Sequence, residues 1–244
     1  MYGVCVVIGI LLVILYLIIL EKRYRTFAAQ RELCIIFSGI GAVIGAKLLY
    51  ILTALPAFWN DLCSAPFGDV CRAYLSGGFV FYGGLYGGLL AACLYIKRSR
   101  LSSNAMLSWL VPIIPLFHAA GRVGCFCAGC CYGIPSETCG IVFLHSPYAP
   151  NNVPLLPVQL IESGFLILLF SLLLILRKKK CCGQFMLGIY LLLYGAGRFL
   201  LEFLRGDEIR GIVYHLSTSQ YISLPTVFLG IVLIVRYRKN RANV

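Results

Sequence analysis

Charged residues are scarce in this chain, and acidic residues are the scarcest of them. Only 12% of the 244 residues are charged, with nine Asp and Glu against 21 Lys and Arg, whereas 60% are hydrophobic. The mean hydropathy is +0.90. This composition excludes a soluble globular domain, which carries about 25% charged residues. The sequence also has no internal repeat and no low-complexity tract, so we expect one integral-membrane domain over residues 1–244.

Long apolar runs fill the sequence instead. Each is close to the ~20 residues that a helix needs to cross a ~30 Å hydrocarbon core. The first run is too long for a signal-peptide core and no small-residue cleavage site follows it, so we expect it to remain as a helix. The predicted fold is an all-α, polytopic membrane helix bundle with seven transmembrane helices, at roughly 2–20, 33–55, 79–96, 105–128, 158–176, 184–204 and 220–235.

The basic residues indicate the orientation of this bundle. Fifteen of the 21 fall in four connecting or terminal segments, 21–32, 97–104, 177–183 and 236–244. Lys and Arg gather on the cytoplasmic side of membrane helices, so we expect the N-terminus outside and the C-terminus in the cytoplasm. The formal charge of +12 is then a topology signal, and we expect no nucleic-acid partner. The outer loops 56–78 and 129–157 are predicted to form a small extracytoplasmic cap.

Three basic residues fall within or near the bilayer, where no topology rule explains them. They are Lys47, Arg122 and Arg198. An ionisable group at this depth is costly and by default suggests a function. Ion pairing with Glu162 or Glu202 is the structural alternative. Three cations against two acids leave room for an anionic ligand.

The stretch around Arg122 predicts a pocket for a lipid phosphate. At helical spacing one face carries His118, Arg122, Cys125 and Gly129, beside a stripe of the small residues Ala120, Gly124 and Ala128. A guanidinium can bind a phosphate with two parallel hydrogen bonds. His118 is either a base or a buried core residue.

A second polar face follows along the chain. Tyr194, Arg198, Glu202 and Arg205 recur at i, i+4, i+8 and i+11, so they share one side of a helix. This side is expected to face protein, water or a headgroup, because it cannot face lipid tails. Gln159 and Glu162 are predicted to point into the bundle from the outer end of the preceding helix.

Cysteine is unusually frequent, at 12 residues. Cys63 and Cys71 share an outer loop and either form a disulfide or stay as free thiols. The run Cys125-Phe-Cys-Ala-Gly-Cys-Cys131 raises a metal site, but structural zinc sites usually need two separated ligand pairs, and no second pair matches. We therefore interpret these cysteines as packing residues at a crowded helix end and predict no metal.

With these features in place, the chain resembles the bacterial prolipoprotein diacylglyceryl transferases over nearly its whole length. The matching blocks are Tyr2-Gly3, Gly45-Ala-Lys-Leu-Leu-Tyr50, Phe81-Tyr-Gly-Gly84, Gly121-Arg-Val-Gly124 with Gly133, Pro157-Val-Gln-Leu-Ile-Glu162, Tyr194-x3-Arg198-x3-Glu202-x2-Arg205 and Ser219-Gln-Tyr-Ile-Ser223.

The resemblance implies an enzyme that transfers a diacylglyceryl group from phosphatidylglycerol to the thiol of the lipobox cysteine in a prolipoprotein signal peptide, releasing glycerol phosphate. It implies a multi-pass protein of the bacterial plasma membrane with its active site toward the outer leaflet, and no cofactor. Arg122 and Arg198 match the two arginines that hold the donor. The implied catalytic residues are Arg122, Arg198, Tyr82 and Glu202, and the implied substrate-binding residues are Tyr2, Lys47, Tyr50, Gly124, Cys125, Gln159, Glu162, Tyr194 and Arg205.

The chain departs from the family pattern at several positions. The family usually has His at the position of Tyr82, Asn at Cys125 and at Ala128, and Glu at Cys130. Tyr82 replaces that histidine as a base only if a nearby arginine lowers the pKa of its phenol. Two other functions stay open: a phosphatidylglycerol-dependent transferase with a different acceptor, and a permease for a small sulfur-containing anion.

Overall fold

The computed structural model describes the backbone of residues 2–23, 28–207, 212–213 and 216–242, and the side chains of residues 3–19, 30, 32–207 and 216–240. The described residues are mostly helical. They form two compact units, one within Met1–Tyr24 and Asn104–Val244 and the other within Arg25–Ser103. The single domain over residues 1–244 remains a prediction.

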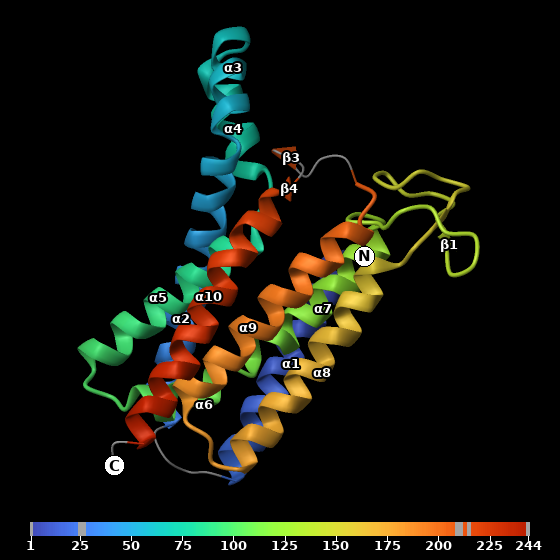
Figure 1. Ribbon diagram of the computed structural model, residues 1–244. Helices are drawn as coiled ribbons and strands as arrows, with labels where there is room; N and C mark the ends of the chain where they lie inside the picture. Colours follow the sequence, from blue (N-terminus) through green and yellow to red (C-terminus); the bar gives the residue numbers. More distant parts are fainter. Residues whose placement is uncertain (1, 24–27, 208–211, 214–215, 243–244) are drawn as a thin grey trace. The chain divides into compact units, whose positions relative to one another are not determined.

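The first unit is a bundle of neighbouring helices (Figure 1). Contacts run from α1 to α7, α7 to α8, α8 to α9 and α9 to α10. Its helices are α1 (Tyr2–Arg23), α6 (Ser103–Leu110), α7 (Ile113–Ala128), α8 (Val158–Lys178), α9 (Gly183–Leu201), the 3₁₀ turn η1 (Glu202–Leu204) and α10 (Thr218–Ala242). Its core includes Leu166, Met186, Tyr190 and Tyr194, each no more than 1% exposed.

Two short hairpins complete this unit. Strand β1 (Ile141–Val142) pairs antiparallel with β2 (Pro154–Leu155), and β3 (Ile212–Val213) with β4 (Leu216–Ser217). The segment that carries β1 and β2 is also joined to η1, which follows α9, because the Ile134 N–H donates to the Leu204 carbonyl at 3.0 Å. Residues 129–157 are therefore structured and hold the chain that follows α9.

The second unit is built on two closely packed helices, α2 (Ala28–Thr53) and α5 (Phe81–Arg98). A Cβ added to Gly45 would lie 2.3 Å from the Gly83 carbonyl oxygen, so the backbones touch where the sequence places glycines at i, i+4 spacing. Gly41 approaches α5 in the same way, since a Cβ added there would lie 2.7 Å from the Gly87 carbonyl oxygen. The chain between these two helices contains two short helices, α3 (Leu55–Ser64) and α4 (Phe67–Ser76).

Five helices among the described residues are long and apolar enough to cross a membrane. A sixth span results if α4 and α5, which meet at a 76° bend, count as one. The apolar part of α1, Gly3–Ile19, is shorter than the others. The chain is thus a multi-pass helical membrane protein, and the predicted number of seven spans is not established.

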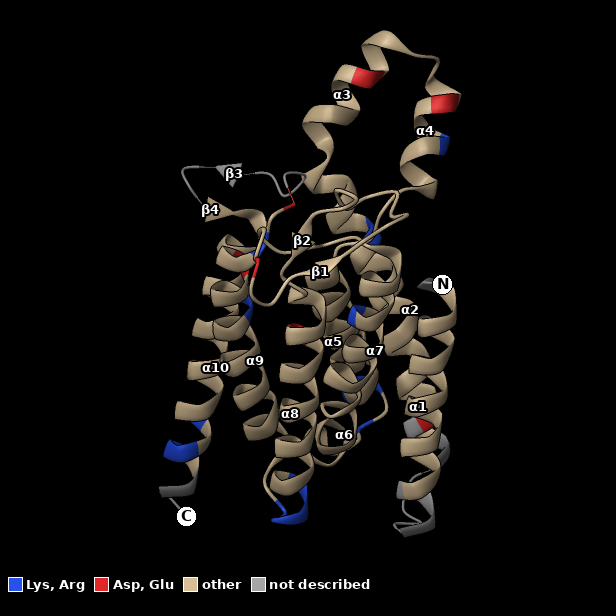
Figure 2. Ribbon diagram, turned by 90° about the vertical axis from the view of Figure 1, so that its right-hand side faces the viewer, with Lys and Arg blue, Asp and Glu red and all other residues tan. Residues whose placement is uncertain are grey.

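Basic side chains mark one end of the first unit. Arg177 and Lys178 end α8, and Arg236, Arg238 and Lys239 lie in the last turns of α10, at the end of the bundle away from the β1–β2 segment (Figure 2). Farther along α8 and α10, large apolar side chains such as Leu168 and Phe228 are about 70% exposed. Such an exterior suits lipid, because a soluble protein rarely exposes so much apolar surface.

Candidate active site

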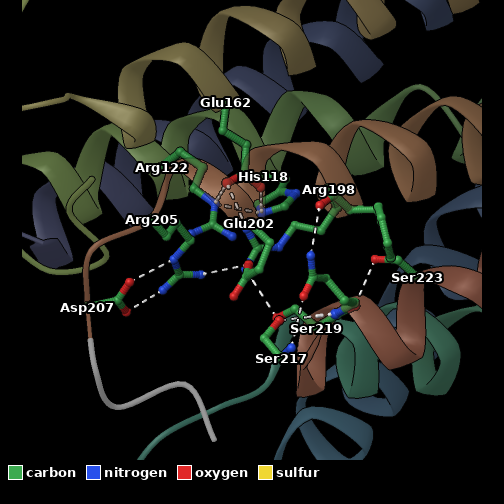
Figure 3. Close-up of polar contacts among 12 residues, drawn as sticks. His118, Arg122, Glu162, Arg198, Glu202, Arg205, Asp207, Ser217, Ser219 and Ser223 are labelled. Carbon is green, nitrogen blue, oxygen red and sulfur yellow. Dashed lines mark hydrogen bonds and ion pairs between the residues drawn. The ribbon is translucent and has the colours of Figure 1, made fainter. Parts of the chain in front are cut away.

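Seven side chains from α7, α8, α9 and the chain beyond form a continuous row of polar contacts inside the first unit (Figure 3). We call this the charged row. Its order is His118, Arg122, Glu162, Arg198, Glu202, Arg205 and Asp207. The first five are buried, so the charged groups among them must be paired within the protein or by a ligand.

Near one end of the row, Arg122 makes its contacts through Nε, the guanidinium nitrogen closest to the backbone. Its Nε lies 3.1 Å from Oε2 of Glu162 and donates to Nε2 of His118 at 3.2 Å. Because His118 accepts at Nε2, its imidazole is neutral in this arrangement, with its hydrogen on Nδ1. The ring also packs edge-on against Tyr194, with 5.4 Å between centroids. His118 therefore supports Arg122.

Glu162 stands between the two arginines that the sequence places at membrane depth. Its Oε2 is 3.1 Å from Nε of Arg122 and 3.8 Å from Nη1 of Arg198. The Glu162 side chain is 2% exposed. One carboxylate thus fixes both guanidinium groups, because an unpaired cation at this depth is costly.

The other end of the row is organised by Glu202. Its Oε2 lies 2.6 Å from Nη2 of Arg198, one helical turn earlier, and 3.7 Å from Nη1 of Arg205. Arg198 also donates from Nη2 to the Ser219 hydroxyl at 3.2 Å. Arg205 in turn donates from Nε and Nη2 to both oxygens of Asp207. These hydrogen bonds to Asp207 raise the pKa of Arg205, although burial opposes them.

Several guanidinium hydrogens in the row are left over. Arg122 makes its hydrogen bond to His118 and its closest contact with Glu162 through Nε, which leaves Nη1 and Nη2 without a hydrogen bond to another described residue. Nη1 of Arg198 is buried and has no hydrogen-bond partner there either. A buried donor is normally satisfied, and an oxygen of an anion would satisfy Nη1 of Arg198.

Counting charges changes the reason for expecting an anion. With Asp207 the row holds three guanidinium groups and three carboxylates. The predicted excess of cations is not found in the row, and Lys47 belongs to the second unit. Hydrogen-bond donors at the row, more than an excess of positive charge, are therefore what an anion would bind.

Beside the row, the end of α7 brings thiols together. The sulfur atoms of Cys125, Cys130 and Cys131 all lie within 4.8 Å of one another. Cys130 also donates from Sγ to the Cys125 carbonyl oxygen at 3.7 Å. Cys127 is exposed and outside this group. None of the twelve cysteines forms a disulfide in the described chain, Cys63 and Cys71 included.

Most predicted site residues of the first unit lie in or beside the charged row. Arg122, Glu162, Arg198, Glu202 and Arg205 belong to it, and Tyr194 contacts it through His118. Gln159 is buried and donates from Nε2 to the Cys130 carbonyl at 2.8 Å, so it braces the turn after α7. Gly124 is buried on α7. Cys125 belongs to the cluster that it forms with Cys130 and Cys131.

Lys47, Tyr50 and Tyr82 belong to the second unit. Lys47 donates to the Gly77 carbonyl at 2.8 Å, and its Nζ lies 5.0 Å from the ring centroid of Tyr50. Tyr82 is buried and stacks on Tyr86. The substrate roles implied for these residues remain predictions, and the side chain of Tyr2 lies outside the described residues.

Sequence reasoning missed two members of the site, Asp207 and Ser219. Asp207 follows Arg205 by two residues, and this close spacing of opposite charges was the available signal. Ser219 appears in the sequence analysis only as the first residue of a matching block and was given no role. Its role depends on how α10 packs against α9, which a single sequence does not specify.

The fold and the charged row define an integral membrane protein whose interior carries arginines with free donors for an anionic group. Comparison with known proteins makes this more specific. The family model for prolipoprotein diacylglyceryl transferase matches residues 1–236. The chain belongs to the prolipoprotein diacylglyceryl transferase family.

Three relatives support this assignment, and each is named as a phosphatidylglycerol–prolipoprotein diacylglyceryl transferase. The protein of Clostridium tetani is 39% identical over 98% of this chain and 94% of its own length. The second such transferase of Clostridium perfringens is 38% identical over 81% and 75%. The protein of Rickettsia conorii is 30% identical over 96% and 90%.

Proposed function

We propose that the chain transfers a diacylglyceryl group from phosphatidylglycerol to the lipobox cysteine thiol of a prolipoprotein, with release of glycerol phosphate. The relatives are named for this reaction. The observation that carries the proposal to this chain is the pair Arg122 and Arg198, joined through Glu162 with guanidinium donors left over.

The reaction explains why two fixed arginines are useful. The acceptor sulfur attacks the glyceryl carbon that carries the phosphate, and the carbon–oxygen bond breaks as the sulfur–carbon bond forms. Negative charge then grows on the departing phosphate. Donors that are already aimed at this charge stabilise the transition state more than the ground state. Glu162 and Glu202 keep the two guanidinium groups in place.

The proposed orientation puts this chemistry toward the outer leaflet. The charged row lies near the start of α8 and the end of α9, away from the basic ends of α8 and α10. By the positive-inside rule those basic ends face the cytoplasm. We propose seven spans with the N-terminus outside, a bacterial plasma-membrane location and a cap formed by loops 56–78 and 129–157.

Transfer of labelled lipid tests the function. Membranes that contain the chain are given phosphatidylglycerol labelled in its acyl chains and a lipobox peptide, and labelled peptide is measured. Arg122→Ala and Arg198→Ala should each lower transfer ~100-fold or more, the typical effect of losing one such donor. Arg236→Ala, which removes an exposed arginine at the far end of α10, should leave it unchanged. Wild-type transfer in both site variants would refute the assignment.

The same experiment separates the alternatives. Release of glycerol phosphate from phosphatidylglycerol without labelling of the lipobox peptide would indicate a different acceptor. The permease alternative finds no support in the relatives, since the three above are named as transferases.

A further inference from the structure

The three converging thiols form a ligand set that the charged row does not use. Cys125, Cys130 and Cys131 are each half-buried, and their sulfur atoms lie within 4.8 Å of one another. Thiolates that share one Zn²⁺ at ~2.3 Å lie roughly 3.8 Å apart. Small side-chain movements therefore suffice to bring all three onto one ion.

The backbone holds this arrangement in place. Helix α7 stops at Gly129, whose φ of 73° lies in the left-handed region. The Gly129 N–H donates to the Phe126 carbonyl and the Cys130 N–H donates to the Cys125 carbonyl. These hydrogen bonds reverse the chain direction and fold it back over the helix end. Cys131 also has a left-handed φ, 59°, which is uncommon for a residue with a side chain.

A neighbouring helix supports the same turn. Gln159 of α8 is 1% exposed and donates to the Cys130 carbonyl at 2.8 Å. Such outer contacts orient the ligands of a metal site and are a normal part of its construction. The three cysteines are thus held in place by residues of two helices, α7 and α8.

The electrostatic surroundings also suit a bound metal ion. Three thiolates around one Zn²⁺ carry a net charge of −1. Arg122 lies one helical turn before Cys125, and both Arg122 and Arg205 interact electrostatically with Cys131. The two arginines would therefore stabilise the loaded site.

We propose that Cys125, Cys130 and Cys131 bind Zn²⁺ and that its fourth position takes the acceptor thiol. The sequence argued against a metal because it lacks two separated cysteine pairs, but three protein ligands with one open position is the pattern of catalytic zinc sites. The acceptor part of this inference rests on the proposed function, whereas metal binding does not.

The metal would supply what a thiol acceptor needs. A thiol that coordinates zinc loses its proton, here to solvent, as the zinc–sulfur bond forms. The sulfur then bonds to the glyceryl carbon, and the carbon–oxygen electron pair leaves with the phosphate near Arg122. The thioether product is a neutral, weaker ligand, so it is released.

Co²⁺ titration of the purified full-length chain tests the site. After removal of metals with a chelator, under reducing conditions, one equivalent of Co²⁺ should give the visible absorption of a thiolate site, and Zn²⁺ should abolish it. Cys125→Ser and Cys130→Ser should weaken Co²⁺ binding at least ~10-fold, the typical effect of disturbing a metal site. Cys127→Ser and Cys139→Ser, which change exposed cysteines outside the group, should bind like the wild type.

Two further readouts complete the test. A lipobox peptide should change the Co²⁺ spectrum, while the same peptide with serine in place of its cysteine should not. Chelation should lower lipid transfer at least tenfold, and Zn²⁺ should restore it. Circular dichroism must show equal helix content in all variants.

The outcomes separate the site from the reaction. Equal Co²⁺ affinity in wild type and variants, or a disulfide between two of the three thiols in place of metal binding, would overturn the proposal. Full transfer by metal-free protein would overturn the acceptor role while the proposed function stands. Metal binding with a peptide response but without transfer in any state would support the site and contradict the proposed function.

Discussion

At the scale of single residues, Glu162 is the most consequential side chain. It is the shared partner of Arg122 and Arg198, and it is almost completely buried. Removing one partner of a buried ion pair is costly because the other charge stays behind, at about 3–5 kcal/mol. Glu162→Gln should therefore destabilise the protein by that amount, as measured by thermal unfolding in detergent.

A matched variant makes that result interpretable. Glu137 is exposed in the segment after α7 and makes no ion pair among the described residues. Glu137→Gln should unfold at the wild-type temperature. If Glu162→Gln and Glu137→Gln are equally stable, the charged row is not held together as described.

His118 offers a second prediction at this scale. It accepts a hydrogen bond from Arg122, so we assign it a positioning role and not that of the base. His118→Gln keeps an acceptor oxygen and should retain most transfer with an unchanged pH profile, whereas His118→Leu should lose at least ~10-fold. A general base contributes about 10²–10⁴-fold. A loss of that size in His118→Gln, with an altered pH profile, would make His118 the base.

At the scale of elements, the packing of α2 on α5 depends on the absence of side chains. A Cβ at Gly45 would meet the Gly83 backbone, whereas one at Gly39 would meet nothing within 4 Å. Gly45→Ala should lower the free energy of unfolding by about 1–3 kcal/mol, as expected for overpacking. Gly39→Ala is the control and should not destabilise. Equal melting temperatures of the two variants would mean that the helices do not approach so closely.

The end of α9 shows which contacts helical periodicity predicts correctly and which it does not. The spacing of Arg198 and Glu202 predicts one helical face, and the pair is found one turn apart at 2.6 Å. The α-helix ends at Leu201, however, and Arg205 is extended with ψ of 139°. Arg205 keeps its predicted neighbour Glu202 but takes Asp207 as its closest partner, which a continued helix would not have placed there.

Other parts of the site were beyond sequence reasoning for a related reason. Glu162 was predicted to point into the bundle from the outer end of its helix, and it is buried between Arg122 and Arg198. The meeting of Cys125 with Cys130 and Cys131 depends instead on a chain reversal with two left-handed residues. Spacing along a helix does not encode such a reversal, so the cysteines were interpreted as packing residues.

At the scale of the whole molecule, the membrane topology is the main prediction. Basic residues at the ends of α8 and α10 predict by the positive-inside rule that those ends face the cytoplasm. A fluorescent protein fused after residue 244 should fluoresce, and alkaline phosphatase fused there should be inactive. Alkaline phosphatase fused within 129–157, after truncation, should be active. The reverse pattern would invert the orientation and place the charged row toward the inner leaflet.

The central claim is that Arg122 and Arg198 hold the phosphate of phosphatidylglycerol. Mass spectrometry of the lipids that co-purify with the chain tests this most directly. The wild type should retain phosphatidylglycerol in excess over the surrounding membrane, and the Arg122→Ala, Arg198→Ala double variant should lose this excess while Arg236→Ala keeps it. Equal enrichment in the wild type and the double variant would contradict the account.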